Sequence, residues 1–377
     1  MITGEVVRGP QCLDSLRVPW ERLYGERERE PSTSWAWSRA ILRNHLAGNR
    51  DWFTVVLRRN AEVAAIIPML STRTRVLGNE IVALQPIQEQ NNTHSDLLIG
   101  ADGELLGAWL DELEKIEPRW DLLNMSRLLE GSPLLSALES ELRRRRQPFH
   151  VRVEQPSYHL RLPANFDEYL AARSGKFRSH LKRAEKRFMA TGNVAFEVVD
   201  AAADVEARYE ELLGIERGSW KHEHGTAISA MPHQAGFYRD LSVAAREAGM
   251  LHLSFLRLDG VAVAYNLGIL AGGRYYYLKT SYLQQYREQG VATIGRARLI
   301  RELIGRGIRD FDFPAEPYEW ERQWTDEARW HRSLQLFNRG LRGRLLWLMS
   351  ALRNRLRKGR RREIVYSDAR ALHAPES

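Results

Sequence analysis

The chain has little cysteine and no long apolar run. Cys12 is the only cysteine among 377 residues, which excludes an intrachain disulfide and a cysteine metal cluster. The amino-terminal residues lack the basic and apolar run of a signal peptide, and no segment approaches the ~20 apolar residues of a membrane span. These absences predict a cytoplasmic protein, either free or held at the inner face of a membrane.

Two catalytic motifs and a metal site are also missing. The sequence contains no Gly-x-Ser-x-Gly and no Gly-x-x-x-x-Gly-Lys-Ser/Thr, so hydrolase and P-loop functions have no motif support. His222, His224 and His233 lie in a polar stretch, but no third ligand stands at a recognised metal spacing. We expect a mobile loop on the acceptor side and no metal.

Length and an internal similarity predict two α/β modules. A chain of 377 residues with 44% hydrophobic content can bury two cores. The hairpin LRRNAEVAA at 57–65 is similar to LRLDGVAVA at 256–264, which suggests a repeat. We expect a mixed-sheet module over 1–155, a second module over 156–340, and a basic amphipathic tail over 341–377.

Apolar spacing and turn residues predict the elements of each module. In the first module the expected helices cover 1–45, 105–116 and 134–146, and the expected strands cover 52–57, 63–69, 80–84, 95–99 and 120–124. In the second module the expected helices cover 174–191, 205–217, 235–248 and a segment that begins at 290. Its expected strands cover 158–162, 194–199, 251–258, 261–270, 308–314 and a segment that begins at 274.

The turn at 287–292 connects an expected strand to an expected helix. The N–H groups and the dipole at a helix start can bind a pyrophosphate, and small residues let the backbone approach it. The turn reads Arg-Glu-Gln-Gly-Val-Ala and resembles the Arg/Gln-x-x-Gly-x-Gly/Ala signature of the GNAT acyltransferases. That resemblance implies acyl-coenzyme A bound by Arg287, Gln289, Gly290, Val291, Ala292 and Thr293. The first module has no equivalent turn.

Further stretches resemble one branch of that superfamily. They are the basic helix at 180–187, the segment ERGSWK at 216–221, and Phe-Asp-Phe at 311–313 followed by Tyr318 and Trp324. The branch comprises double-module acetyltransferase-like proteins linked to bacterial cellulose and exopolysaccharide genes, distantly related to Fem aminoacyltransferases. It usually has a lysine where this chain has Glu319, which leaves the acceptor open.

The resemblance implies transfer of an acyl group, acetyl foremost, from a thioester to an amine or hydroxyl of a small molecule or glycan. The candidate bases are Glu216 and Asp312, although Glu216 could equally be a surface carboxylate paired with Arg217 or Lys221. Asp312 should point away from its phenylalanine neighbours, toward the cleft between the modules or toward solvent. A structural role for Asp312 is also open.

Two tyrosines complete the candidate site. Tyr282 and Tyr318 could protonate the departing thiolate or simply pack and bind substrate. Backbone N–H groups around 277–281 are the natural donors to the oxyanion.

Two basic segments suggest anionic partners. Residues 341–362 contain nine basic residues and no acid, with leucines at helical spacing, which favours an anionic membrane surface or a partner helix. The helix at 176–187 is also basic, which is typical of a solvated helix face, and it would contact tRNA in a Fem-like enzyme. Two alternatives therefore remain: an aminoacyl-tRNA-dependent transferase and a non-catalytic, membrane-tethered binding protein.

Overall fold

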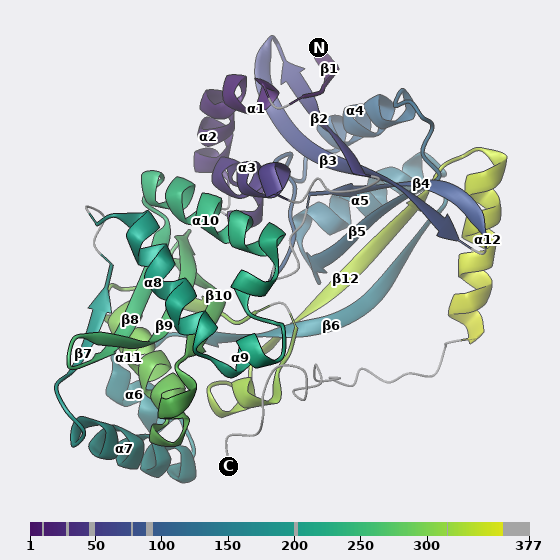
Figure 1. Cartoon of the computed structure of the whole chain (residues 1–377). Helices are drawn as coiled ribbons and strands as arrows, with labels where there is room; N and C mark the ends of the chain where they lie inside the picture. Colours follow the sequence, from purple (N-terminus) through teal and green to yellow (C-terminus); the bar gives the residue numbers. More distant parts are fainter. Residues whose placement is uncertain are drawn as a thin grey trace. The chain divides into compact units, whose positions relative to one another are not determined.

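The computed structural model describes residues 1–9, 11–27, 30–44, 50–76, 78–87, 93–199, 203–314 and 316–356. Within these ranges the chain forms two compact units, one made of 1–156 with 329–356 and the other of 157–328. Strand β6 (Phe149–Arg161) carries the chain from the first unit into the second, and β12 (Ala328–Phe337) carries it back. Figure 1 labels the elements of both units.

The first unit is built on a mixed sheet of order β1-β2-β3-β4-β5-β12-β6. Its strands are β1 (Ile2–Val7), β2 (Arg50–Arg59), β3 (Glu62–Val76), β4 (Asn79–Pro86), β5 (Leu122–Leu129), β12 and the start of β6. Its helices are α1 (Gln11–Ser15), α2 (Arg17–Glu26), η1 (Pro31–Thr33), α3 (Trp35–Asn44), α4 (Gly103–Glu114), α5 (Pro133–Arg144) and α12 (Leu341–Leu356). Leucines and Trp109 of α4 and α5 pack on the sheet as its core.

The second unit repeats this plan around the order β6-β11-β10-β9-β8-β7. Its further strands are β7 (Val194–Val198), β8 (Leu251–Leu258), β9 (Val261–Ala271), β10 (Arg274–Tyr282) and β11 (Asp310–Asp312). Its helices are α6 (Phe166–Ala171), α7 (Gly175–Met189), α8 (Val205–Arg217), α9 (Trp220–Glu223), η2 (Ile228–Ala230), α10 (Pro232–Glu247), η3 (Gln284–Gln289), α11 (Val291–Gly305) and η4 (Glu319–Gln323).

The predicted repeat is confirmed by the order of the elements. In the first unit an antiparallel run β1-β2-β3-β4 is followed by α4 and then by β5, which pairs in parallel with β4. In the second unit β7-β8-β9-β10 are followed by α11 and by β11, which pairs in parallel with β10. The chain is therefore two α/β modules of one kind, followed by the helix α12.

Several element predictions were wrong. Residues 2–7 form an edge strand on β2 instead of a helix, because the helical spacing begins only at Leu13 while 2–7 are largely β-branched. Residues 95–99 make two isolated bridges, Ser95 to Leu128 and Ile66 to Leu98, instead of a strand. Strand β12 was not predicted. Because of this strand, residues 329–356 belong to the first unit, whereas the sequence pattern assigned 329–340 to the second module.

The histidine stretch differs from the loop that the sequence suggested. His222 lies within the short helix α9 and His224 ends it. Of the predicted tail, α12 covers 341–356, and the remaining residues lie outside the described part of the chain. Among the residues described, no helix combines the length and apolar character needed to cross a bilayer.

Candidate active site

Strands β10 and β11 of the second unit pair for only three residues and then part. The parallel pairs join Arg274 to Asp310, Tyr275 to Phe311 and Tyr276 to Asp312, after which β11 ends and β10 continues along β9 to Tyr282. Tyr277 pairs with Gly268 and Lys279 with Leu267, so the residue between them is a β-bulge on β10. Beyond Tyr276, β10 is therefore no longer paired with β11.

The Gly290 turn follows β10 after the 3-10 helix η3. Gly290 has a φ of 71°, which a residue with a side chain adopts only at a cost, and its N–H donates to the Arg287 carbonyl at 3.0 Å. No side chain caps α11, so the N–H groups of Val291, Ala292 and Thr293 point out of the helix start without an intrahelical acceptor. Together with the helix dipole they can bind a phosphate.

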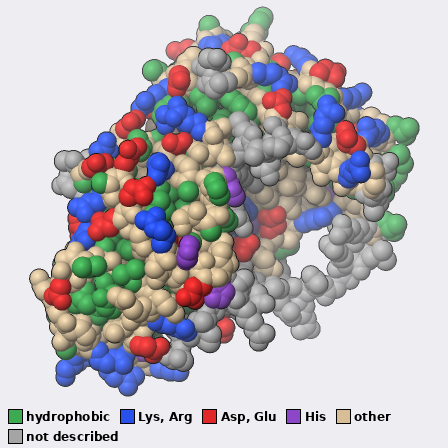
Figure 2. All heavy atoms as spheres, in the orientation of Figure 1, with side chains coloured by type: hydrophobic (Ala, Val, Ile, Leu, Met, Phe, Trp, Pro, Cys, Tyr) green, Lys and Arg blue, Asp and Glu red, His purple; other side chains and the backbone are tan. Residues whose placement is uncertain are grey.

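The basic helix α7 packs against this turn. Ala184 and Phe188 share a buried cluster with Val291 and Ile294, and a Cβ at Gly290 would lie 3.3 Å from the Ala184 Cβ. The basic side chains of α7 remain exposed: Lys176, Arg178, Lys182, Arg183, Lys186 and Arg187. Figure 2 shows Lys and Arg side chains in blue at the lower left, where Figure 1 has α7. A positively charged face thus lies beside the start of α11.

Glu216 is fully buried at the end of α8, not at the surface. Its Oε1 accepts a hydrogen bond from the Tyr265 hydroxyl at 2.6 Å, and its Oε2 accepts one from the Ile228 N–H at 3.0 Å. Lys221 Nζ lies 3.5 Å from Oε1 and donates to the Thr280 carbonyl of β10 at 2.5 Å. Burial and the adjacent Glu216 charge raise the pKa of Tyr265 well above its usual value.

Asp312 is buried at the end of β11, on the opposite face from Phe311 and Phe313. The two phenylalanine rings pack on each other with centroids 4.8 Å apart, whereas the Asp312 carboxylate lies 3.5 Å from Arg274 Nε. Arg274 thus lies beside a carboxylate that is buried from water. Asp312 therefore sits where the two strands part, on the face carrying Arg274.

The two candidate tyrosines lie on different elements. Tyr282 is half-buried and packs against the cluster that supports the Gly290 turn. The Tyr318 N–H donates to Glu321 Oε2 at 3.1 Å, and its ring stacks on Trp320 at the start of η4. The structure thus places Tyr282 by the turn and Tyr318 in the segment that follows β11. Their roles as acids stay predictions.

Sequence reasoning missed two buried charged residues of the second unit, Arg296 and Glu321. The Arg296 guanidinium of α11 lies 3.9 Å from the centre of the Trp320 ring and 5.7 Å from that of Tyr277. Glu321 is fully buried, and burial raises its pKa well above the usual range although the Arg296 charge opposes the rise. The sequence did contain a signal for a buried arginine: Arg296 is at helical spacing with Leu299 and Leu303 on the apolar face of α11.

The equivalent helix start in the first unit already holds an anion. The Asp102 carboxylate caps α4 by accepting from the N–H groups of Glu104 and Leu105, at 3.0 and 3.1 Å. Arg59 binds the same carboxylate at 2.7 Å. A phosphate at this helix start would have to displace Asp102, whereas no side chain among the described residues caps the start of α11.

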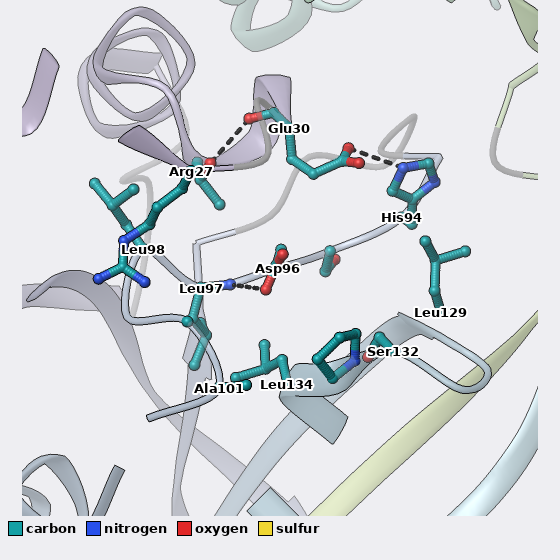
Figure 3. Close-up of a pocket in the computed structure, with 14 residues that line it drawn as sticks. Arg27, Glu30, His94, Asp96, Leu97, Leu98, Ala101, Leu129, Ser132 and Leu134 are labelled. Carbon is teal, nitrogen blue, oxygen red and sulfur yellow. Dashed lines mark hydrogen bonds and ion pairs between the residues drawn. The ribbon is translucent and has the colours of Figure 1, made fainter. Parts of the chain in front are cut away.

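A polar pocket of about 260 Å³ lies elsewhere in the first unit (Figure 3). Glu30 and His94 form a buried pair on its wall, with 2.8 Å between Oε2 and Nε2. The Asp96 carboxylate and the half-buried Arg27 also line it. Groups of both charges around a small cavity suit a small polar molecule. No three potential metal ligands gather anywhere in the described ranges.

Comparisons with known proteins agree with this fold. Residues 175–322 match the family model of the acetyltransferase (GNAT) domain. No curated protein matches the sequence. The structure is similar to that of FemX, with 12% identity and a TM-score of 0.58, over 92% of this chain and 99% of that one.

Two further solved structures share the fold. One is the C-terminal domain (DUF2156) of a putative lysylphosphatidylglycerol synthetase from Agrobacterium fabrum, with 12% identity, a TM-score of 0.53, and coverage of 90% of this chain and 97% of that one. The other is a protein of unknown function from Bacteroides thetaiotaomicron, with 14% identity, a TM-score of 0.53, and coverage of 90% and 100%. Residues 175–322 thus match the acetyltransferase (GNAT) domain model, and the chain has the double-module fold that FemX shares.

Proposed function

We propose that this protein transfers an acyl group, acetyl foremost, from acyl-coenzyme A bound at residues 287–293 to an amine or hydroxyl acceptor. The observation that carries the proposal is the uncapped start of α11, where Gly290 and three free N–H groups follow a strand that parts from its neighbour. The pyrophosphate would bind these N–H groups, with Arg287 and Gln289 beside it.

The parting of β10 and β11 supports a place for the acyl end of the donor. A thioester carbonyl beside β10 could accept hydrogen bonds from backbone N–H groups around the bulge at Leu278, which would stabilise the oxyanion. The acceptor nitrogen or oxygen attacks this carbonyl carbon and the carbon–sulfur bond breaks. The acceptor proton passes to a base and the thiolate gains a proton.

The structure supports different roles for the two candidate bases. Asp312 is held by Arg274 at the point where the strands part, so it is the stronger candidate for a base or for an acceptor-binding carboxylate. Glu216 already accepts two hydrogen bonds and contacts Lys221, which binds β10, so it is better suited to positioning that strand. Tyr282 and Tyr318 remain the proposed donors to the thiolate.

A second candidate donor is aminoacyl-tRNA. The exposed basic face of α7 beside the Gly290 turn supports it, because a phosphate backbone binds basic side chains. The pyrophosphate of acyl-coenzyme A could bind the N–H groups at the start of α11 without using the basic side chains of α7. We therefore favour acyl-coenzyme A as the donor. A protein that binds neither donor would support the non-catalytic alternative.

The test is acceptor-dependent release of coenzyme A thiol from acetyl-coenzyme A. The purified chain is incubated with pooled amino sugars, polyamines, amino acids and oligosaccharides, and free thiol is measured with a chromogenic disulfide. We expect release that needs both protein and acceptor and that falls at least about tenfold in Asp312→Asn if this carboxylate is the base. Release from charged tRNA but not from acetyl-coenzyme A would replace the proposal with the tRNA alternative.

A further inference from the structure

Helix α12 of the first unit presents leucines to solvent. Leu341, Leu345, Leu348 and Leu352 are 77%, 51%, 55% and 62% exposed, and Met349 is 39% exposed. Their spacing of four, three and four residues puts the leucines on one face of the helix. A helix normally buries such a stripe, so its exposure needs a physical explanation.

The opposite side of α12 is attached to the sheet of the same unit. The Trp347 ring stacks on His150 with centroids 5.9 Å apart, and the Ser350 hydroxyl accepts a hydrogen bond from Arg152 Nη2 at 2.5 Å. Near the helix start, a Cβ at Gly343 would lie 2.1 Å from the Asn338 carbonyl oxygen, so only glycine permits this close approach. These contacts hold the leucine stripe outward.

Figure 2 shows hydrophobic side chains along the outer edge of the molecule at α12. The helix has 16 residues and is therefore about 24 Å long. Beside its apolar face, Arg344 is exposed, whereas Arg342 lies 3.7 Å from Asp121 Oδ1. The whole segment 341–362 contains nine basic residues and no acid. Apolar side chains flanked by arginines are the pattern of a helix that lies in the plane of an anionic membrane.

A second copy of the chain is a poorer occupant for the same face. Leucines at this spacing could pack against an identical helix, but the arginines of both copies would then be brought together. No acidic residue within 341–362 could pair with them across such an interface. Charge thus favours phosphate headgroups over self-association.

We propose that α12 is a membrane-docking helix, which inserts its leucine face among the acyl chains of an anionic bilayer while its arginines bind lipid phosphates. The contacts of Trp347 and Ser350 orient that face before the protein meets the membrane. The proposal does not depend on which donor the second unit uses.

Flotation with lipid vesicles tests it on the full chain. We expect binding to vesicles made of equal parts phosphatidylcholine and phosphatidylglycerol, little binding to phosphatidylcholine alone, and release as salt is raised. The variant Leu345→Ser/Leu348→Ser should lose at least about tenfold in affinity because two inserted side chains are removed. Val18→Ser, on an exposed valine of α2 in the same unit, is the matched control and should bind like wild type.

Circular dichroism spectra of all variants establish that the fold is kept. Failure of the wild type to float with anionic vesicles would overturn the proposal, as would equal flotation of the serine double variant. Sedimentation without lipid supplies the competing outcome: a dimer that dissociates in Leu345→Ser/Leu348→Ser would assign the stripe to a second copy instead.

Discussion

The Tyr265 hydroxyl of β9 donates a hydrogen bond to the Glu216 carboxylate at 2.6 Å, and both side chains are fully buried. The other Glu216 oxygen accepts the Ile228 N–H, and Lys221 links the same carboxylate to the Thr280 carbonyl. One carboxylate thus joins α8, η2 and two strands of the second unit. This network holds β10 in place near its bulge and the Gly290 turn.

Glu216→Gln should therefore lower stability. The amide cannot reproduce every hydrogen bond of the carboxylate, and a buried group left partly unsatisfied costs about 1–3 kcal/mol. The free energy of unfolding in urea measures the loss. Glu223→Gln, on an exposed glutamate of the neighbouring α9, should be close to neutral. If Glu216→Gln abolished acyl transfer at unchanged stability, Glu216 would be the base and not a positioning residue.

Glu321 should make the second unit less stable as pH rises. Burial raises its folded-state pKa above the unfolded value, so the contribution of its neutral carboxyl is fully present below the unfolded pKa of about 4.3. That contribution is lost as pH rises through the folded pKa. Relative to wild type, Glu321→Gln should therefore gain stability as pH is raised above the unfolded pKa of about 4.3. Glu319→Gln, on an exposed neighbour, is the control, and parallel stability–pH curves for wild type and Glu321→Gln would contradict the assignment.

His331 should have the opposite dependence on pH in the first unit. Burial lowers its pKa to about 3, and the neighbouring His94 ring, 6.3 Å away, also disfavours a charge. In the unfolded chain His331 takes up a proton near pH 6.5, whereas in the folded chain it stays neutral until about pH 3. Wild type therefore loses stability as pH falls from 6.5 toward 3. In His331→Phe this loss should be smaller, as monitored by the urea midpoint at several pH values. An unchanged acid response in the variant would rule His331 out as its source.

The backbone turns of the second unit could be predicted from the sequence alone. The glycine after β10 and the aspartate–glycine hairpin at 259–260 specify backbone turns by themselves, so the Gly290 turn and the repeat could be predicted. Strand β12 could not, because its partner β5 lies about two hundred residues earlier and the basic Arg329, His331 and Arg332 obscure its alternation. The contact of Arg296 with Trp320 could not be predicted for the same reason, since η4 reaches α11 only in the folded unit.

Titration calorimetry with acetyl-coenzyme A tests the central claim most directly. Wild type should bind with a dissociation constant in the micromolar range, about −8 kcal/mol. Gly290→Trp should abolish binding, because its side chain would occupy a positive-φ position 3.3 Å from Ala184 and cover the free N–H groups. Gly305→Trp places the same side chain in open space at the other end of α11 and should bind normally. Binding that survives Gly290→Trp, or no binding to wild type, would contradict an acyl-coenzyme A site at this turn.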